Sequence, residues 1–387
     1  MKNKKKIIII VAIAVVVMLA VTLSLVAGVY KMFLSPADFT DYIIPVSGDG
    51  TGYYRYCYEE LNENEKKIYS IVLEQIPSQP DKIEVPQLQD GDLNKVFKAL
   101  SYDNPQLFNM GLNCRLFTQG QKSFFEVDYT MDSATYQSRL AEVENIANVI
   151  VEGASQHTSD YEKEKYVHDY IINHCVYVDA AEGSNANNIY GCLVEGKASC
   201  EGYSRAFQYL LSKLDISNRI VTGEAASDGV NYIAHMWNFV WLDDKGYFVD
   251  VTWDDPKGDS PLSLHTYFNV NTNDILIKHR NIEQPIPLTT EVEYNYYVYE
   301  ATYLQIGSGD TFETAVSNAV YNALYNNQNC VEFRFPNGAV AQQARNSLFN
   351  TGVIYNVYTE AGVFTSSGSG QVYYVADDAM NTICLFF

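Results

Sequence analysis

Positive charge is scarce in this 387-residue chain. Lysine and arginine together number 26 against 47 acidic residues, which gives a formal net charge of -21 at pH 7. After residue 35 no basic patch with interleaved aromatic residues appears. Because nucleic acids and anionic membrane surfaces attract basic surfaces, this balance argues against both, and we expect no nucleic-acid partner.

Cysteine is also sparse. The seven cysteines are scattered, and no CxxC pair occurs. This spacing indicates neither a zinc site nor a disulfide framework, and no motif indicates another metal or cofactor. An odd count leaves at least one thiol unpaired in an exported protein. Four cysteines in apolar surroundings are expected to be small core residues: Cys175, Cys192, Cys330 and Cys384.

The N-terminal end differs from the rest of the chain. Four lysines in residues 1–6 precede an uncharged apolar run over residues 7–29. As a helix this run would span about 34 Å, enough for a hydrocarbon core of ~30 Å. Lysines favour the cytoplasmic side, so we expect a single-pass anchor in the cell membrane with the remaining chain outside the cytoplasm. A cleaved signal peptide is the alternative, because small residues stand at Ala27 and Gly28, but its apolar region is usually only about 7–15 residues long.

The remaining chain divides into four parts, and no internal repeat is present. They are a tether over residues 30–57, an α+β region over 58–155, a part with the candidate site over 156–290, and an α+β module over 291–387. In the module, helices are expected at 311–325 and 340–349, and strands at 330–335, 354–359, 372–376 and 382–386. The role of this module is not evident from its residues.

Cys200 stands where a glycine-containing loop meets an expected helix. The partial positive charge at a helix N-terminus favours a thiolate, and the free N–H groups there can donate to an acyl oxyanion. Gly202 has no side chain to crowd a substrate approaching the sulfur. A buried structural cysteine is the alternative reading of Cys200 viewed alone. No side-chain oxyanion donor can be assigned.

His235 and Asp250 lie on two expected strands joined by a turn over residues 243–246. A hairpin loop with an even number of residues would place both side chains on one face, opposite or one diagonal step apart. A lone histidine is more often structural, and His168, His174 and His265 are read in that way. A carboxylate inside an apolar strand needs a partner, which favours a pair between Asp250 and His235.

Three motifs resemble those of the transglutaminase-like superfamily: EGKASCEGY at 195–203, HMWN at 235–238 and DVTW at 250–253. The resemblance covers roughly residues 160–270, and the region before it, including DNPQLF at 103–108, is similar to leader regions of bacterial surface members. It implies a papain-like triad, with Cys200 as nucleophile, His235 as general base and then acid, and Asp250 as the residue that orients the imidazole.

We therefore expect an α+β fold, in which a papain-like core packs the Cys200 helix on an antiparallel sheet between smaller α+β regions. The expected activity is acyl transfer on amide bonds of a protein or peptide substrate, cell-wall-associated substrates included. Hydrolysis is favoured over crosslinking because no dedicated amine site is evident. The alternative is a non-catalytic surface binding or scaffold protein with a vestigial triad.

Overall fold

The structure is a computed structural model of the chain. It describes residues 55–88, 91–179, 185–255, 264–305, 311–363 and 371–387. The expected membrane anchor lies outside the described residues. Within the described ranges, no helix is both long enough and apolar enough to cross a membrane. The described residues form two compact units, one from Tyr56–Ser101 and Asn109–Gln137, the other from Tyr102–Phe108 and Ser138–Phe387.

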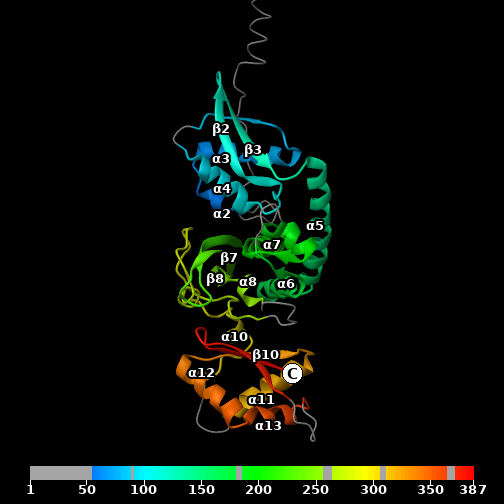
Figure 1. The fold of residues 1–387 in the computed structure, drawn as a ribbon, viewed down its shortest axis with the longest axis vertical. Helices are drawn as coiled ribbons and strands as arrows, with labels where there is room; N and C mark the ends of the chain where they lie inside the picture. The colour runs from blue at the N-terminus through cyan, green and yellow to red at the C-terminus, as the bar shows by residue number, and fades with distance from the viewer. Residues whose placement is uncertain (1–54, 89–90, 180–184, 256–263, 306–310, 364–370) are drawn as a thin grey trace, which may run out of the picture. The chain divides into compact units, whose positions relative to one another are not determined.

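The first unit combines short helices with a three-stranded antiparallel sheet (Figure 1). Its helices are α2 (Tyr56–Glu59), α3 (Glu63–Gln75), the short η1 (Ile76–Ser78) and most of α4 (Leu93–Asp103). Its strands are β1 (Ile83–Val85), β2 (Met110–Gln119) and β3 (Lys122–Tyr129), in the order β1-β3-β2. A capping box starts α3, because Asn62 accepts from the Glu65 N–H and the Glu65 carboxylate accepts from the Asn62 N–H.

The second unit contains a four-stranded antiparallel sheet with the order β8-β7-β6-β9. Its strands are β6 (Asn218–Ala225), β7 (Ile233–Leu242), β8 (Lys245–Val249) and β9 (His279–Arg280). Helix α7 (Cys200–Lys213) packs against β6 and β7, and α6 (Asp160–His174) packs against α7. The expected α+β arrangement, with the Cys200 helix on an antiparallel sheet, is therefore confirmed.

One long helix and several short elements complete this part of the second unit. They are most of α5 (Ser133–Ala154), β4 (Val176–Tyr177), η2 (Asn185–Asn187), the π-helical turn η3 (Gly191–Glu195), β5 (Lys197–Ala198), α8 (Val251–Asp254), α9 (Thr272–Ile275) and α10 (Tyr296–Tyr299). Strands β4 and β5 pair in parallel. Ser159 and Glu162 form a capping box at the start of α6.

Two features fix the register of the β7–β8 hairpin. Its loop is the two residues Asp243 and Asp244, both with positive φ (47° and 60°), as tight hairpins require. Leu242 therefore pairs with Lys245. On one face of β7, Trp237 and Phe239 are fully buried and belong to a core cluster of aromatic and aliphatic side chains. This packing would be lost if the register slipped by one residue.

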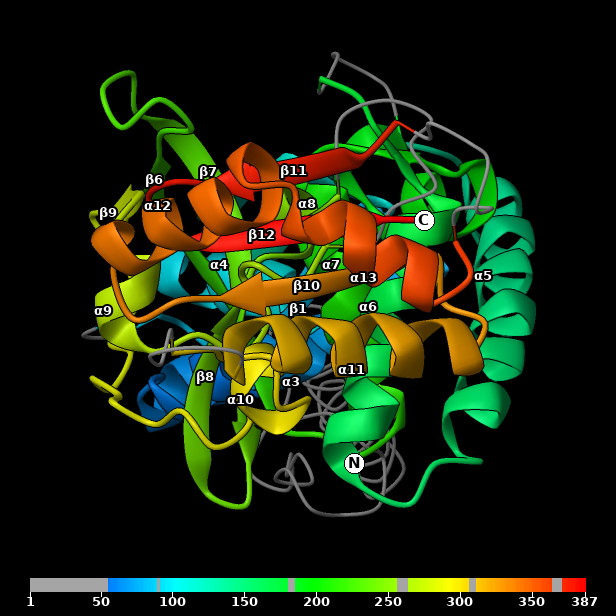
Figure 2. The same ribbon diagram turned by 90° about the horizontal axis from the view of Figure 1, so that it is seen from below.

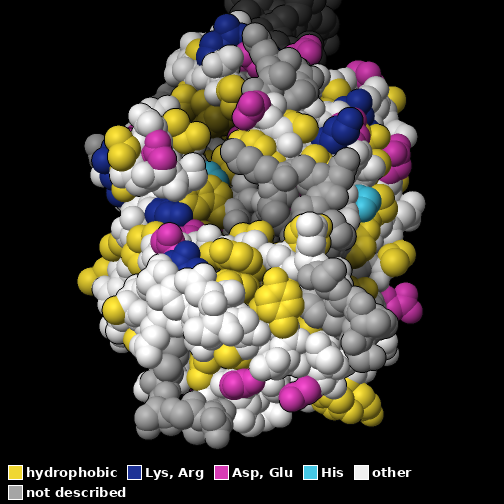
Figure 3. All heavy atoms as spheres, turned by 60° about the horizontal axis from the view of Figure 1, so that its bottom comes forward, with side chains coloured by type: hydrophobic (Ala, Val, Ile, Leu, Met, Phe, Trp, Pro, Cys, Tyr) yellow, Lys and Arg dark blue, Asp and Glu magenta, His cyan; other side chains and the backbone are white. Residues whose placement is uncertain are grey.

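The C-terminal module is a three-stranded antiparallel sheet covered on one face by helices α11 (Thr311–Tyr325), α12 (Gly338–Arg345) and α13 (Val353–Glu360), as Figure 2 shows. The strand order is β10-β12-β11, and the short η4 (Asn346–Asn350) continues α12. The strands are β10 (Cys330–Arg334), β11 (Tyr373–Asp377) and β12 (Thr382–Phe386). The face in Figure 3 shows hydrophobic side chains scattered among neutral polar ones, with few charges.

One expectation in this module is wrong, because residues 354–359 form helix α13 and not a strand. Ile354, Val357 and Tyr358 are buried in the module core, and their spacing is helical. Gly352, with φ of 80°, turns the chain into the helix. The other five expected elements of the module form at or close to the predicted positions.

Candidate active site

Cys200 is the first residue of α7 and is partly exposed. Ser199 stands at the N-cap, but its hydroxyl does not accept from the first-turn amides and is turned toward Asn187 Oδ1, to which it donates at 2.7 Å. Serine at this position ordinarily occupies one of those N–H groups. The amides around Cys200 are thus left uncapped by Ser199, as an oxyanion site requires.

Two hydrogen bonds hold α7 against the strand that carries His235. The Ser204 hydroxyl contacts the Met236 carbonyl oxygen at 2.9 Å, and Asn238 Nδ2 donates to the Ser204 carbonyl oxygen at 3.0 Å. Ser204 lies one helical turn after Cys200, and Met236 directly follows His235. These bonds fix the sulfur and the imidazole relative to each other.

Gly202 has a different role from the one expected. A Cβ atom there would lie 2.3 Å from the Ala186 carbonyl oxygen and 2.7 Å from the Ala198 Cβ. The glycine is buried and allows the helix start to pack against these backbone segments. The expectation that it leaves room for a substrate is therefore corrected, because the space is filled by the protein itself.

His235 lies between the sulfur and a carboxylate. Its Nε2 is 2.7 Å from Asp250 Oδ2, and Cys200 also acts on the imidazole, because it helps to raise its pKa. Burial alone would lower the pKa of His235. The charge of Asp250, the hydrogen bond that Asp250 accepts from His235 and the contribution of Cys200 outweigh burial and raise the pKa of His235 to about 10. The surroundings favour an imidazolium, the form that stabilises a neighbouring thiolate.

Asp250 is not inside a strand, as the sequence suggested, but directly after β8, where it caps α8. Its Oδ1 accepts from the amides of Thr252 (3.1 Å) and Trp253 (3.2 Å). The even two-residue loop puts its side chain within reach of His235, as parity required. Burial alone would raise the pKa of Asp250. The charge of His235 and the hydrogen bonds that the carboxylate accepts outweigh burial and lower this pKa below its ordinary value, so the carboxylate is ionised.

A second histidine, which no sequence pattern indicates, also contacts the Asp250 carboxylate. His279 on β9 places Nε2 2.9 Å from Asp250 Oδ2 and Nδ1 3.1 Å from the Ile275 carbonyl oxygen. Its side chain is fully buried. A two-residue strand has no periodicity, and a histidine 29 residues after its partner forms no motif. The sequence therefore offered no signal for it.

Aromatic side chains surround the three groups. The indole of Trp237 stacks near His235 at 5.8 Å between ring centroids, and Trp253 lies 5.6 Å away. Tyr177 also lies near the sulfur: burial raises its pKa, and the negative charges of Cys200 and Asp179 raise it further.

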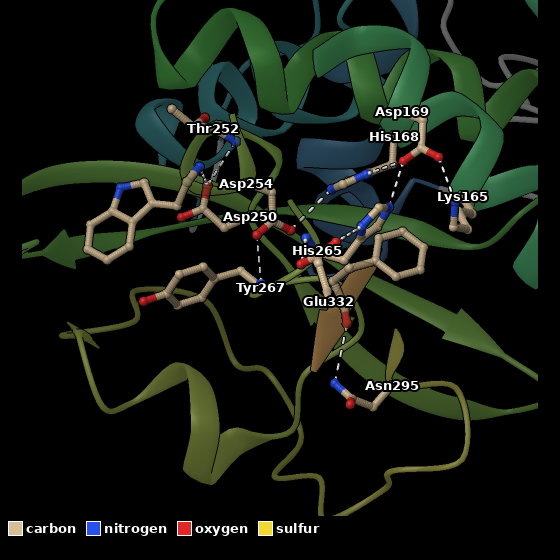
Figure 4. Close-up of polar contacts among 12 residues, drawn as sticks. Lys165, His168, Asp169, Asp250, Thr252, Asp254, His265, Tyr267, Asn295 and Glu332 are labelled. Carbon is tan, nitrogen blue, oxygen red and sulfur yellow. Dashed lines mark hydrogen bonds and ion pairs between the residues drawn. The ribbon is translucent and has the colours of Figure 1, made fainter. Parts of the chain in front are cut away.

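A buried polar network adjoins the triad (Figure 4). Asp254, at the end of α8, accepts from the Tyr267 amide at 2.8 Å, and its Oδ2 is 3.1 Å from His168 Nε2. The other nitrogen of His168 is 3.1 Å from Asp169 Oδ1. His265 Nε2 contacts the same oxygen at 2.8 Å. The helix capped by Asp250 is thereby held at its other end.

The network reaches the C-terminal module through Glu332 on β10. His265 Nδ1 is 2.6 Å from Glu332 Oε1, and the His265 amide donates to Oε2 at 3.0 Å. Burial lowers the pKa of His265, but Asp169 and Glu332 outweigh it and raise the pKa to about 9. Lys165 Nζ donates to Asp169 Oδ2 at 2.7 Å.

Two groups of side chains have the spacing of metal ligands: His168, Asp169 and His265, and His235, Asp250 and His279. In the first group each ring nitrogen already contacts a carboxylate, and the Asp169 carboxylate also binds the Lys165 ammonium. The second group is the candidate triad with its extra histidine. The side chains of both groups therefore already have hydrogen-bond partners within the protein.

Residues 144–251 match the family model described as the transglutaminase-like superfamily. These residues form a transglutaminase-like domain. Cys200, His235 and Asp250 all lie within it. The kyphoscoliosis peptidase of Mus musculus is 26% identical over 181 residues, which cover 44% of this chain and 25% of the mouse protein.

Two solved structures are similar over part of their length. A TGase crystal structure is 18% identical, with 44% of this chain and 50% of that chain covered and a TM-score of 0.27. The periplasmic domain of TgpA from Pseudomonas aeruginosa is 18% identical, with 35% and 57% covered and a TM-score of 0.22. The chain thus spans a quarter of the mouse protein and little more than half of either structure.

Proposed function

We propose that this chain is a thiol enzyme that transfers acyl groups from amide bonds through Cys200, His235 and Asp250. The observation that carries the proposal is the His235 imidazole, which lies 2.7 Å from the Asp250 carboxylate on a strand that two hydrogen bonds hold against the start of the Cys200 helix. Nucleophile, base and orienting group in this succession are what nucleophilic acyl transfer needs.

The reaction would run in two steps. The Cys200 thiolate attacks the amide carbonyl, and the uncapped amides at the start of α7 stabilise the oxyanion. The proton held by His235 passes to the leaving nitrogen, the C–N bond breaks, and a thioester and a free amine result. His235 then takes a proton from water, which attacks the thioester, and the acid is released as the thiol forms again.

Hydrolysis is the favoured outcome. The partial similarity to a mouse protein named a peptidase supports cleavage of peptide or cell-wall-associated amide bonds over crosslinking. We also propose that the enzyme acts outside the cytoplasm, held at the membrane by residues 7–29. The support for this placement is the lysine-rich end followed by the apolar run.

The test is the rate of Cys200 alkylation by iodoacetamide near pH 7, measured by mass spectrometry of its peptide. We expect a rate at least ~10-fold above that of N-acetylcysteine, and a fall to the reference rate in His235→Ala. His174→Gln, a histidine on α6 outside the site, should leave the rate unchanged. Alkylation of wild-type Cys200 at the reference rate would instead support the scaffold alternative.

A second assay separates the two acyl acceptors. The protein is incubated with a glutamine peptide and a labelled primary amine, and products are compared with those of Cys200→Ala. We expect cleaved or deamidated peptide that depends on Cys200. Amine incorporation as the main product would overturn the preference for hydrolysis.

A further inference from the structure

We propose that His279 is a positioning residue for this acyl transfer, which orients the Asp250 carboxylate toward His235 and limits the reactivity of Cys200 at acid pH. The inference rests on the proposed function. It gives a role to a buried histidine that lies outside the three matching motifs.

The sheet places the two histidines on either side of one carboxylate oxygen. In β6, Gly223 pairs with His235 of β7, and Ala225 pairs with His279 of β9. Positions 223 and 225 have the same parity, so both imidazoles project from the same face of the sheet. Both approach Asp250 Oδ2, at 2.7 Å and 2.9 Å. The other oxygen of Asp250 is held by two amides of α8.

All four contacts together prevent rotation of the carboxylate. Without His279, one lone pair of Oδ2 would face a pocket of aromatic rings and would lack a donor. Trp237, Trp253 and Tyr267 line that pocket, with centroids 4.6 to 5.6 Å from the His279 ring. A buried carboxylate that loses a donor tends to turn or to bind a proton, and either change weakens its hold on His235.

The two contacts of His279 also determine which ring nitrogen carries the proton of the neutral imidazole. A neutral imidazole has one N–H, yet Nε2 faces an ionised carboxylate and Nδ1 faces the Ile275 carbonyl oxygen. The carboxylate is the stronger acceptor, so the neutral ring carries its proton on Nε2. Nδ1 then remains as the place for a second proton.

Charge around His279 controls that second proton. The titratable groups that face the ring are Asp250, His235 and Tyr267, while its chain neighbours Lys278 and Arg280 pair with other carboxylates. Burial, together with the charge of His235, keeps the pKa of His279 below its ordinary value despite Asp250. On acidification the ring becomes cationic and opposes the His235 imidazolium that supports the thiolate.

Two isosteric variants test the inference. The amide of His279→Gln reproduces the Nε2 donor toward Asp250, whereas that of His279→Asn reaches only the position of Nδ1 near the Ile275 carbonyl oxygen. We expect the glutamine variant to keep its alkylation rate and kcat/KM at pH 8 within about 3-fold, and the asparagine variant to lose roughly 10- to 100-fold, as outer-shell partners do.

The pH profile provides the readout that mere packing would not change. His279→Gln cannot accept the second proton, so at pH 5.5 it should keep a larger fraction of its pH 8 alkylation rate than the wild type. Equal losses in both variants, or a pH profile identical to wild type in His279→Gln, would overturn the inference. Thermal unfolding of each variant, with His174→Gln as the matched control, separates these effects from misfolding.

The outcomes also separate this inference from the proposed function. Slow alkylation of Cys200 in the wild type, at a rate that His235→Ala does not change, would contradict the proposed function. Fast alkylation that depends on His235, but is unaffected in both His279 variants, would leave the enzyme intact and remove only the role of His279.

Discussion

The start of α7 depends on contacts too close for any side chain at Gly202. The backbone there faces the Ala186 carbonyl oxygen, and the Ser199 amide donates to the same oxygen at 2.9 Å. The loop at residue 186 therefore fixes the position of Cys200 through main-chain contacts. The position of the sulfur therefore depends in part on the Ala186 carbonyl oxygen, which takes no part in the proposed reaction.

Gly202→Ala should move this helix start. A methyl group 2.3 Å from a carbonyl oxygen must displace backbone, at a cost of about 1–3 kcal/mol in the free energy of unfolding. We also expect slower alkylation of Cys200, because its distance to His235 changes. Chemical denaturation and alkylation kinetics measure the two effects.

Gly338 provides the control for that substitution. It also lies in the first turn of a helix, but it is exposed, and a Cβ there would meet only Asn381 Oδ1 at 3.4 Å. Gly338→Ala should leave both measurements within error or stabilise slightly. If Gly202→Ala behaves in the same way, the packing argument at the helix start fails.

Residue patterns predict some of this site and not the rest. The proximity of His235 and Asp250 could be predicted because strand parity depends only on the length of one turn. The role of Gly202 could not, because the Ala186 carbonyl that requires it belongs to η2, a three-residue element too short to have a sequence pattern. His279 could not either, because its contact with Asp250 arises only when β9 joins the edge of the sheet.

At the scale of elements, the β-branched composition of residues 354–359 predicts a strand where the chain forms a helix. Residues 354–359 are rich in residues that favour strands, yet they form α13 because burial at helical spacing overrides propensity. The neighbouring strands were predicted because the alternation of their residues fits a sheet with one covered face. On β10, Val331 and Phe333 face the module core, and Glu332 projects from the opposite face to His265.

Glu332→Gln should weaken this junction. The amide is close in shape to the carboxylate but leaves the buried His265 imidazolium without one of its two counter-charges. We expect the free energy of unfolding to fall by about 2 kcal/mol at pH 7, less than the ~3–5 kcal/mol of a fully broken buried pair, because the amide oxygen still accepts a hydrogen bond. Urea denaturation measures the loss.

Glu360→Gln is the matched substitution on an exposed helix end of the same module. It should change stability by no more than about 0.5 kcal/mol. Equal stability of the two variants would show that the Glu332 contact contributes nothing net.

At the scale of the second unit, the C-terminal module is joined to the transglutaminase-like part by ion pairs distant in sequence. Arg334 binds Asp274 at 2.6 Å, and Lys278 binds Asp377 at 2.8 Å. The partners are 60 and 99 residues apart. No local pattern predicts such pairs, which is why the sequence described the module as separate although the two parts form one compact unit.

The charged junction makes stability depend on pH. The pKa of His265 is about 9 in the folded chain and about 6.5 when unfolded. The folded state therefore binds the proton more tightly, so this contribution is complete below pH 6.5 and is lost as pH rises toward 9. At one pKa unit per 1.36 kcal/mol, its upper limit is about 3 kcal/mol.

His235, with a pKa raised to about 10, and Glu164, with a pKa raised to about 8, change stability in the same direction, so the wild-type slope contains all three. The His265→Gln variant isolates the contribution of His265 to the pH dependence of stability. We expect urea denaturation to show the variant well below wild type at pH 6, with the difference narrowing by pH 9 because the proton that wild type loses is already absent. A constant difference between the two proteins from pH 6 to pH 9 would mean that folding does not change the pKa of His265, and that the junction is held by packing and not by charge.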